Sequence, residues 1–246
     1  MYDMANGLSP FTEYDATGAP VYPVGATTIN TASDYNDDNM WEGRDPRLDA
    51  TVLYNGVAWG NGTINVVSGQ RDNPIGNTNA TPTGYYMRKY IPESILGAEH
   101  SQSAYRLWTI IRYAEILLNY AEAMNEANGP CMEVYDMLDR IRQRAGVSGT
   151  VADRSDLTSS IVNMRHFIRK ERTVELAFEE HRPWDVRRWD VAKDALERSV
   201  YGVEVGDDGT VKRKEVQKRV FENWMYLYPI PEGEVWKTNI ENNPGW

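Results

Sequence analysis

The chain has 246 residues, enough for one large domain or two small ones, and its hydrophobic content of 41% is ordinary for a folded protein. Its net charge of −10 argues against binding to nucleic acid or to an anionic membrane surface through general electrostatics. The single cysteine, Cys131, excludes an internal disulfide. No stretch reaches the ~18 apolar residues of a membrane span, and residues 1–5 lack the features of a signal peptide.

Residues 1–104 are predicted to form a loop-rich, ligand-facing segment with short strands. This part holds eleven of the nineteen glycines and seven of the twelve prolines. Residues 48–54 and 63–67 have strand-like composition and are bracketed by turn signals such as Asn55-Gly56. Because loops on a rigid scaffold commonly carry binding residues, this segment is the first place to look for a ligand site.

Residues 105–199 are predicted to form two helical hairpins. Apolar residues recur at helical spacing over residues 105–127, 131–145 and 157–180, and a fourth helix is expected over 183–199. Asn128-Gly129 marks the end of the first helix. The hairpins are tetratricopeptide-like, although the repeat is loose. Since such arrays need about three repeats, the helices are expected to pack on the loop-rich part or on repeats outside this chain.

Residues 200–246 return to short strands. Strands at residues 203–205 and 211–213, joined by a glycine- and aspartate-rich turn, predict a β-hairpin. A further edge strand is predicted at residues 225–231, ahead of a C-terminal extension. The predicted fold is therefore mainly α, with tetratricopeptide-like helical hairpins, an irregular loop-rich subdomain and short β-hairpins.

Charged residues are densest at residues 168–190. Glu171, Glu175 and Glu179 are four apart and share one helix face, and Arg172 is placed to pair with Glu175. A half-buried carboxyl beside the apolar stripe suggests a catalytic acid with a raised pKa. The favoured interpretation is a salt-bridge network between helices, because so many arginines lower the pKa of a carboxyl.

Metal and cofactor signals are weak. The three histidines lack zinc-ligand spacing, and no nucleotide-binding or nucleophile-elbow motif is present. Asp34, Asn36 and Asp38 place oxygen ligands at alternate positions, which makes calcium a weak candidate, but the glycine of a calcium loop is missing. We otherwise expect no cofactor. A glycoside hydrolase, which needs two carboxyls across a cleft, remains a remote alternative without a local pattern to support it.

Aromatic residues in the loop-rich segment suggest carbohydrate binding. The chain has eight Trp and fifteen Tyr but only four Phe, which favours rings with a polar group. Sugar rings stack their C–H faces on aromatic rings, and their hydroxyls need amide or carboxylate partners. The alternative is that these aromatics form a small core. The candidate glycan-binding residues are Tyr35, Asn39, Trp41, Tyr54, Trp59 and Tyr85, with Tyr86 beside them.

Four motifs, in this order along the chain, resemble the SusD/RagB family. They are Arg-Asp-Pro-Arg-Leu at residues 44–48, the helix at 112–123, the charged stretch at 169–190, and the chain end with residues 228–231 and 242–246. The resemblance covers about residues 40–246. It implies a tetratricopeptide scaffold with a loop-rich subdomain.

The resemblance also implies a function. Family members are lipoproteins on the outer face of the outer membrane of Bacteroidetes-type bacteria. They capture oligosaccharides without catalysis and cover a SusC-type TonB-dependent transporter. An alternative is a transporter lid whose ligand is a peptide or another nutrient. Members are roughly twice as long, so we expect this chain to be the C-terminal portion, with the lipid anchor and the N-terminal half of the fold absent.

Overall fold

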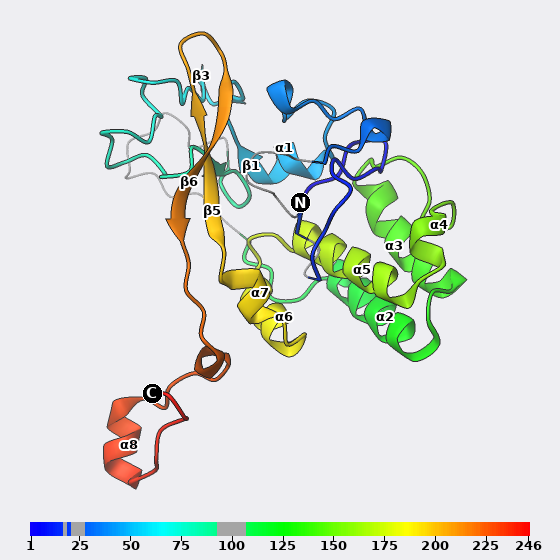
Figure 1. Cartoon of the computed structure of the whole chain (residues 1–246), viewed down its shortest axis with the longest axis vertical. Helices are drawn as coiled ribbons and strands as arrows, with labels where there is room; N and C mark the ends of the chain where they lie inside the picture. The colour runs from blue at the N-terminus through cyan, green and yellow to red at the C-terminus, as the bar shows by residue number, and fades with distance from the viewer. Residues whose placement is uncertain (17–18, 21–27, 93–106) are drawn as a thin grey trace.

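The computed structural model describes residues 1–16, 19–20, 28–92 and 107–246 (Figure 1). Long helices and few short strands confirm the predicted mainly helical fold. The helices are α1 (Arg47–Thr51), α2 (Tyr113–Asn128), α3 (Met132–Arg144), α4 (Ser155–Thr158), α5 (Ile161–Glu175), α6 (Arg182–Arg188), α7 (Ala192–Leu196) and α8 (Glu232–Thr238), with 3₁₀ turns η1 (Thr31–Ser33), η2 (Asp37–Asn39) and η4 (Asn223–Tyr226). The strands are β1 (Val52–Leu53), β2 (Ala58–Trp59), β3 (Gly62–Thr63), β4 (Tyr86–Met87), β5 (Ser199–Val205) and β6 (Val211–Lys218).

Helices α2, α3 and α5 form the helical layer. The apolar stripe of α2 packs against both α3 and α5, and Leu118, Leu138 and Met164 are fully buried between them. Helix α2 ends where the sequence predicts: Gly129 follows it with φ of 76°, and its N–H bonds to the Asn125 carbonyl at 2.9 Å. These three helices enclose the hydrophobic core of the helical layer.

The first predicted helix begins too early. Helix α2 starts at Tyr113, residues 107–112 are not helical, and residues 105–106 lie outside the described ranges. Leu107, Ile110 and Ile111, which were predicted to lie in the core, are exposed. Arg112 has extended backbone instead of a helical turn, and in this geometry its side chain reaches Glu175 at the end of α5 and Glu179 beyond it.

The other two long helices are interrupted. The predicted helix over 157–180 is the short α4 followed by α5, which stops at Glu175. The predicted helix over 183–199 is divided into α6 and α7, and Asp190 between them has φ of 55°. A polar contact accompanies the break, since the indole of Trp189 donates to Glu122 on α2 at 2.8 Å.

The loop-rich part has its own core. Strand β1 pairs with β4 and β2 pairs with β3, both antiparallel, around a cluster that contains Leu53, Ile64 and Val66. Two strand predictions here are only partly right: of residues 48–54, Val52–Leu53 form β1. Residues 48–51 lie in α1, because the Asp45 carboxylate accepts the Arg47 N–H and Pro46 starts the turn. Of residues 63–67, only the first lies in a paired strand.

The predicted β-hairpin is confirmed and is longer than expected. Strands β5 and β6 pair antiparallel, with a bulge between Val200 and Tyr201. β5 docks on the loop-rich part: Val203 N–H donates to the Thr83 carbonyl at 2.9 Å, and a Cβ on Gly202 would lie 2.6 Å from Thr83 backbone atoms. The hairpin therefore closes the loop-rich part on one side (Figure 1).

The C-terminal segment contradicts the last strand prediction. Residues 225–231 contain part of η4 and a proline-flanked connection, and Pro231 directly precedes α8. Figure 1 shows α8 projecting away from the rest of the molecule, and Trp236 on it is 75% exposed. Among the residues that the structure describes, every helix is too short or too polar to cross a membrane.

Candidate functional site

The charged cluster predicted on α5 is a salt-bridge network, as expected. Glu171 accepts from Arg47 at 2.5 Å and from Arg142 at 3.1 Å. Glu175 accepts from Arg47 at 3.1 Å, and also from Arg112 at 2.6 Å. Because Arg47 lies on α1 and Arg142 on α3, the network joins the loop-rich part to the helical layer.

These carboxyls are not poised as catalytic acids. Burial raises the pKa of Glu171, but Arg47 and Arg142 outweigh it and hold that pKa below its ordinary value. The pKa of Glu179 is lowered in the same way, because Arg112 and Lys89 outweigh the effect of burial. Both shifts are typical of carboxylates in a structural salt-bridge network.

One predicted pair within this cluster is wrong. Arg172 was placed to pair with Glu175 three residues on, but its Nε donates to Asp185 on α6 at 2.7 Å. Its Nη1 donates to Asn119 on α2 at 2.7 Å. Arg172 thereby joins α2, α5 and α6 and fixes the wall of a cavity described below.

An open cavity of about 720 Å³ lies between the loop-rich part and β5. We call it the Trp41 cavity. Its size falls in the range of small-ligand sites. Aromatic and polar side chains share the lining, which includes Phe11, Tyr35, Trp41, Arg44, Thr81, Thr83, Tyr85, Tyr86, Met87, Phe178, Tyr201 and Arg213.

Trp41 is held in place by two of the other predicted residues. Its ring stacks on Tyr54 with centroids 5.1 Å apart and planes 13° apart. Its Nε1–H donates to the Tyr85 hydroxyl at 3.3 Å, and the Tyr54 hydroxyl donates to Asp49 at 2.7 Å. The fold thus brings Trp41, Tyr54 and Tyr85 together from separate loops, with the Trp41 ring partly exposed at the cavity.

The remaining predicted residues are placed differently. Tyr35 is only 8% exposed, and its hydroxyl donates to Asp37 at 2.8 Å and accepts from Arg213 at 2.9 Å, so its ring is a core element of the cavity floor. Trp59 lies on β2 outside this lining, with the Arg88 guanidinium 5.4 Å from its ring centroid. Asn39 also lies outside the lining, in a smaller depression of about 300 Å³.

The weak calcium candidate gains no ligand cluster. Asn36 uses its side-chain oxygen to cap η2, accepting the Asp38 N–H, and Asp34 has left-handed backbone at the end of η1. In the described ranges, no three His, Cys, Asp or Glu side chains are grouped so as to hold a metal ion. Calcium binding by Asp34, Asn36 and Asp38 stays a prediction.

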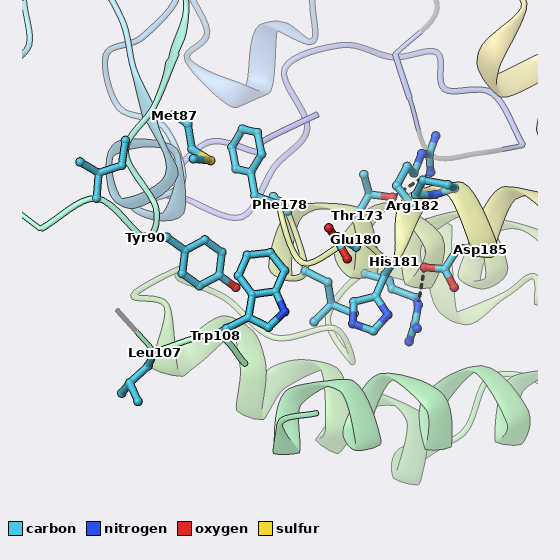
Figure 2. A pocket seen from close by; sticks show the side chains of 15 residues that line it. Met87, Tyr90, Leu107, Trp108, Thr173, Phe178, Glu180, His181, Arg182 and Asp185 are labelled. Carbon is cyan, nitrogen blue, oxygen red and sulfur yellow. Dashed lines mark hydrogen bonds and ion pairs between the residues drawn. The ribbon is translucent and has the colours of Figure 1, made fainter. Parts of the chain in front are cut away.

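A second cavity, of about 700 Å³, lies between residues 87–91, the segment before α2, and the connection from α5 to α6 (Figure 2). We call it the Trp108 cavity. Trp108 stacks on Tyr90 with centroids 5.3 Å apart and planes 30° apart. Three of its lining residues, Tyr90, Phe178 and Glu180, have φ between 63° and 68°, a conformation that costs energy for residues other than glycine and that clusters at ligand sites.

The sequence gives little indication of the Trp108 cavity. Trp108 falls inside the stretch that was predicted to begin the first helix, and Phe178 falls inside the predicted third helix. Left-handed backbone at a phenylalanine has no sequence signature. The His181-Arg182-Pro183 run indicates a helix boundary beside this cavity, because a proline is tolerated in the first turn of a helix but not in its interior. Here Pro183 lies in the first turn of α6, which begins at Arg182.

A model of the SusD family matches residues 1–246, the whole of the chain. The chain belongs to the SusD family. This confirms the resemblance indicated by the four motifs at residues 44–48, 112–123, 169–190 and the chain end.

Several SusD-like proteins are similar to this chain in sequence or in fold. SusD-like protein P2 of Formosa agariphila is 27% identical over 165 residues, which cover 65% of this chain and 30% of the relative. A solved SusD-like protein of Bacteroides fragilis has a TM-score of 0.78 and 27% identity, covering 100% of this chain and 45% of its own. A SusD-like carbohydrate binding protein of the same organism has a TM-score of 0.67 and 31% identity, covering 95% of this chain and 45% of its own. The chain therefore spans less than half the length of these relatives.

Proposed function

We propose that this chain is part of a cell-surface protein that binds oligosaccharides, and that the Trp41 cavity takes part in that binding. The observation that carries the proposal is the assembly of Trp41, Tyr54 and Tyr85 beside an open cavity. One relative of the same fold is described as a carbohydrate binding protein, and the chain shares its family.

The lining suits both the apolar C–H faces and the hydroxyl groups of a sugar. Trp41 is braced from behind by Tyr54 and from the side by Tyr85, so a ring placed against it meets a fixed surface and little side-chain entropy is lost. Thr81 and Thr83 line the same cavity, where the Thr81 hydroxyl donates to the Tyr85 carbonyl at 2.7 Å and the Thr83 hydroxyl accepts the Tyr85 N–H at 3.3 Å. Their hydroxyl oxygens keep the capacity to accept from sugar hydroxyls. This combination favours a polyhydroxylated ligand over a purely apolar one.

The finer role follows from family membership and is also a proposal. The bound glycan is delivered to a SusC-type TonB-dependent transporter in the outer membrane, and a lipid anchor holds the protein at the extracellular face. The protein acts as a binder and not as a glycoside hydrolase. The lowered pKa of Glu171 and of Glu179 argues against these two carboxyls as the proton donor that a hydrolase needs.

Affinity electrophoresis in gels that contain single polysaccharides tests the proposal. We expect at least one polysaccharide to retard the chain, and Trp41→Ala to abolish the retardation. Trp236→Ala is the matched control, since it removes an exposed indole on α8 far from the cavity. Undiminished retardation of a folded Trp41→Ala variant would refute the assignment to the Trp41 cavity, and reducing-sugar release from the same polysaccharide would overturn the non-catalytic role.

A further inference from the structure

The Trp108 cavity has a prepared stacking surface. Trp108 is 60% exposed although one of its faces packs on Tyr90. Figure 2 shows the Trp108 indole beside Tyr90, with Phe178 and Met87 toward one end of the hollow. An exposed indole that is braced on one face offers its other face to a ligand at small entropic cost.

Polar groups lie on one side of this ring (Figure 2). Thr173, Glu180, His181, Arg182 and Asp185 line the same cavity. Arg182 donates to the Thr173 hydroxyl at 2.9 Å, and Asp185 is fixed by Arg172, so the polar rim is ordered by contacts within the protein. An aromatic ring beside hydroxyl and guanidinium groups is common to both cavities, and Glu180 and Asp185 add carboxylates that the described lining of the Trp41 cavity lacks.

The two cavities share a wall. Met87 and Phe178 line both of them, Met87 from β4 and Phe178 from the connection after α5. Both side chains are exposed, and the left-handed backbone at Phe178 presents its ring at this boundary. The two cavities therefore adjoin at two apolar side chains.

We propose that the two cavities are successive subsites of one elongated site, and that its ligand is a linear glycan long enough to reach from Trp41 across Met87 and Phe178 to Trp108. This inference rests on the proposed glycan binding and adds the size class of the ligand. Short oligosaccharides fill the Trp41 cavity alone. Longer chains also stack on Trp108, so affinity rises with chain length until both cavities are occupied.

Isothermal titration with oligosaccharides of graded length tests this inference. The probes are the malto-, cello- and xylo-oligosaccharide series, from disaccharides to the longest soluble members, titrated into the 246-residue chain and its variants. For the series that binds, we expect Trp108→Ala to leave the affinity for short members unchanged and to weaken the long members by about tenfold. We expect Trp108→Phe to recover part of that loss, and Trp236→Ala to change neither.

The outcomes separate this inference from the proposed function. If Trp41→Ala weakens every length and Trp108→Ala weakens none, glycan binding stands and the elongated site is refuted. If Trp108→Ala instead changes the oligomeric state or lowers the Tm without a length-dependent loss of affinity, Trp108 is a protein contact and the elongated site is again refuted. If no series binds and no polysaccharide retards the chain, the proposed function itself fails and the inference falls with it.

Discussion

Replacing Arg47 with methionine removes the guanidinium that joins the loop-rich part to α5. The side chain is buried, and it donates to Asp45 at 2.6 Å, to Glu171 at 2.5 Å and to Glu175 at 3.1 Å. Methionine keeps most of the aliphatic stem, so the change isolates the charge. The expected consequence is a large loss of stability, since buried carboxylates remain without one of their cations.

The structure sets the magnitude of that loss. Breaking a buried ion pair by removing one partner costs about 3–5 kcal/mol. Glu171 keeps Arg142 at 3.1 Å and Glu175 keeps Arg112 at 2.6 Å, whereas Asp45, only 1% exposed, has no second ion pair among the described residues. The loss falls mainly on Asp45, so we expect Arg47→Met to lower the free energy of unfolding by about 3 kcal/mol, the lower end of that range.

Urea unfolding followed by circular dichroism at pH 7 measures this loss. Arg144→Met is the matched control, because Arg144 also donates to Glu175, at 2.7 Å, but its side chain is 61% exposed. Such a pair contributes less than about 1 kcal/mol. The reasoning is refuted if Arg47→Met and Arg144→Met destabilise the chain equally.

Three further outcomes follow from the fold and are checked by the same unfolding measurement. Gly202→Ala places a Cβ 2.6 Å from the Thr83 backbone, so we expect the free energy of unfolding to fall by about 2 kcal/mol or more. Because Gly202 and Thr83 line the Trp41 cavity, we also expect a lower glycan affinity. Leu138→Ala opens the fully buried helical core and should cost about 2–5 kcal/mol, whereas Trp236→Ala on the exposed α8 should cost less than about 0.5 kcal/mol. The lowered pKa of Glu171 contributes stability that is complete above the ordinary pKa of 4.5 and is lost as the pH falls through the lowered value. We therefore expect the free energy of unfolding to decline below about pH 4.5. A flat profile down to pH 3 would contradict this.

The sequence predicts the helical layer well because periodicity and stop signals act locally. Helices α2 and α3 end at the glycines that their patterns indicate, and Leu118 and Leu138 lie in the core. Periodicity fails where a long-range polar contact outweighs it. Arg112 is extended toward Glu175 and Glu179 from across the fold, and this contact cannot be read from the residues around it.

The candidate site was only partly predictable for a similar reason. Aromatic composition identified Trp41, Tyr54 and Tyr85, but it did not show that they contact one another, nor that Tyr35 is buried. Those facts depend on packing between loops and β5. Trp108 was missed because its exposure follows from a helix that begins later than its pattern indicates.

The affinity of one bound oligosaccharide for the Trp41→Ala variant tests the central claim most directly. The measurement is isothermal titration of the unmodified chain, Trp41→Ala and Trp236→Ala, with circular dichroism to show that all three are folded. The account predicts that Trp41→Ala loses about tenfold or more in affinity while Trp236→Ala binds like the unmodified chain. Equal affinity of all three proteins would contradict the assignment of glycan binding to the Trp41 cavity.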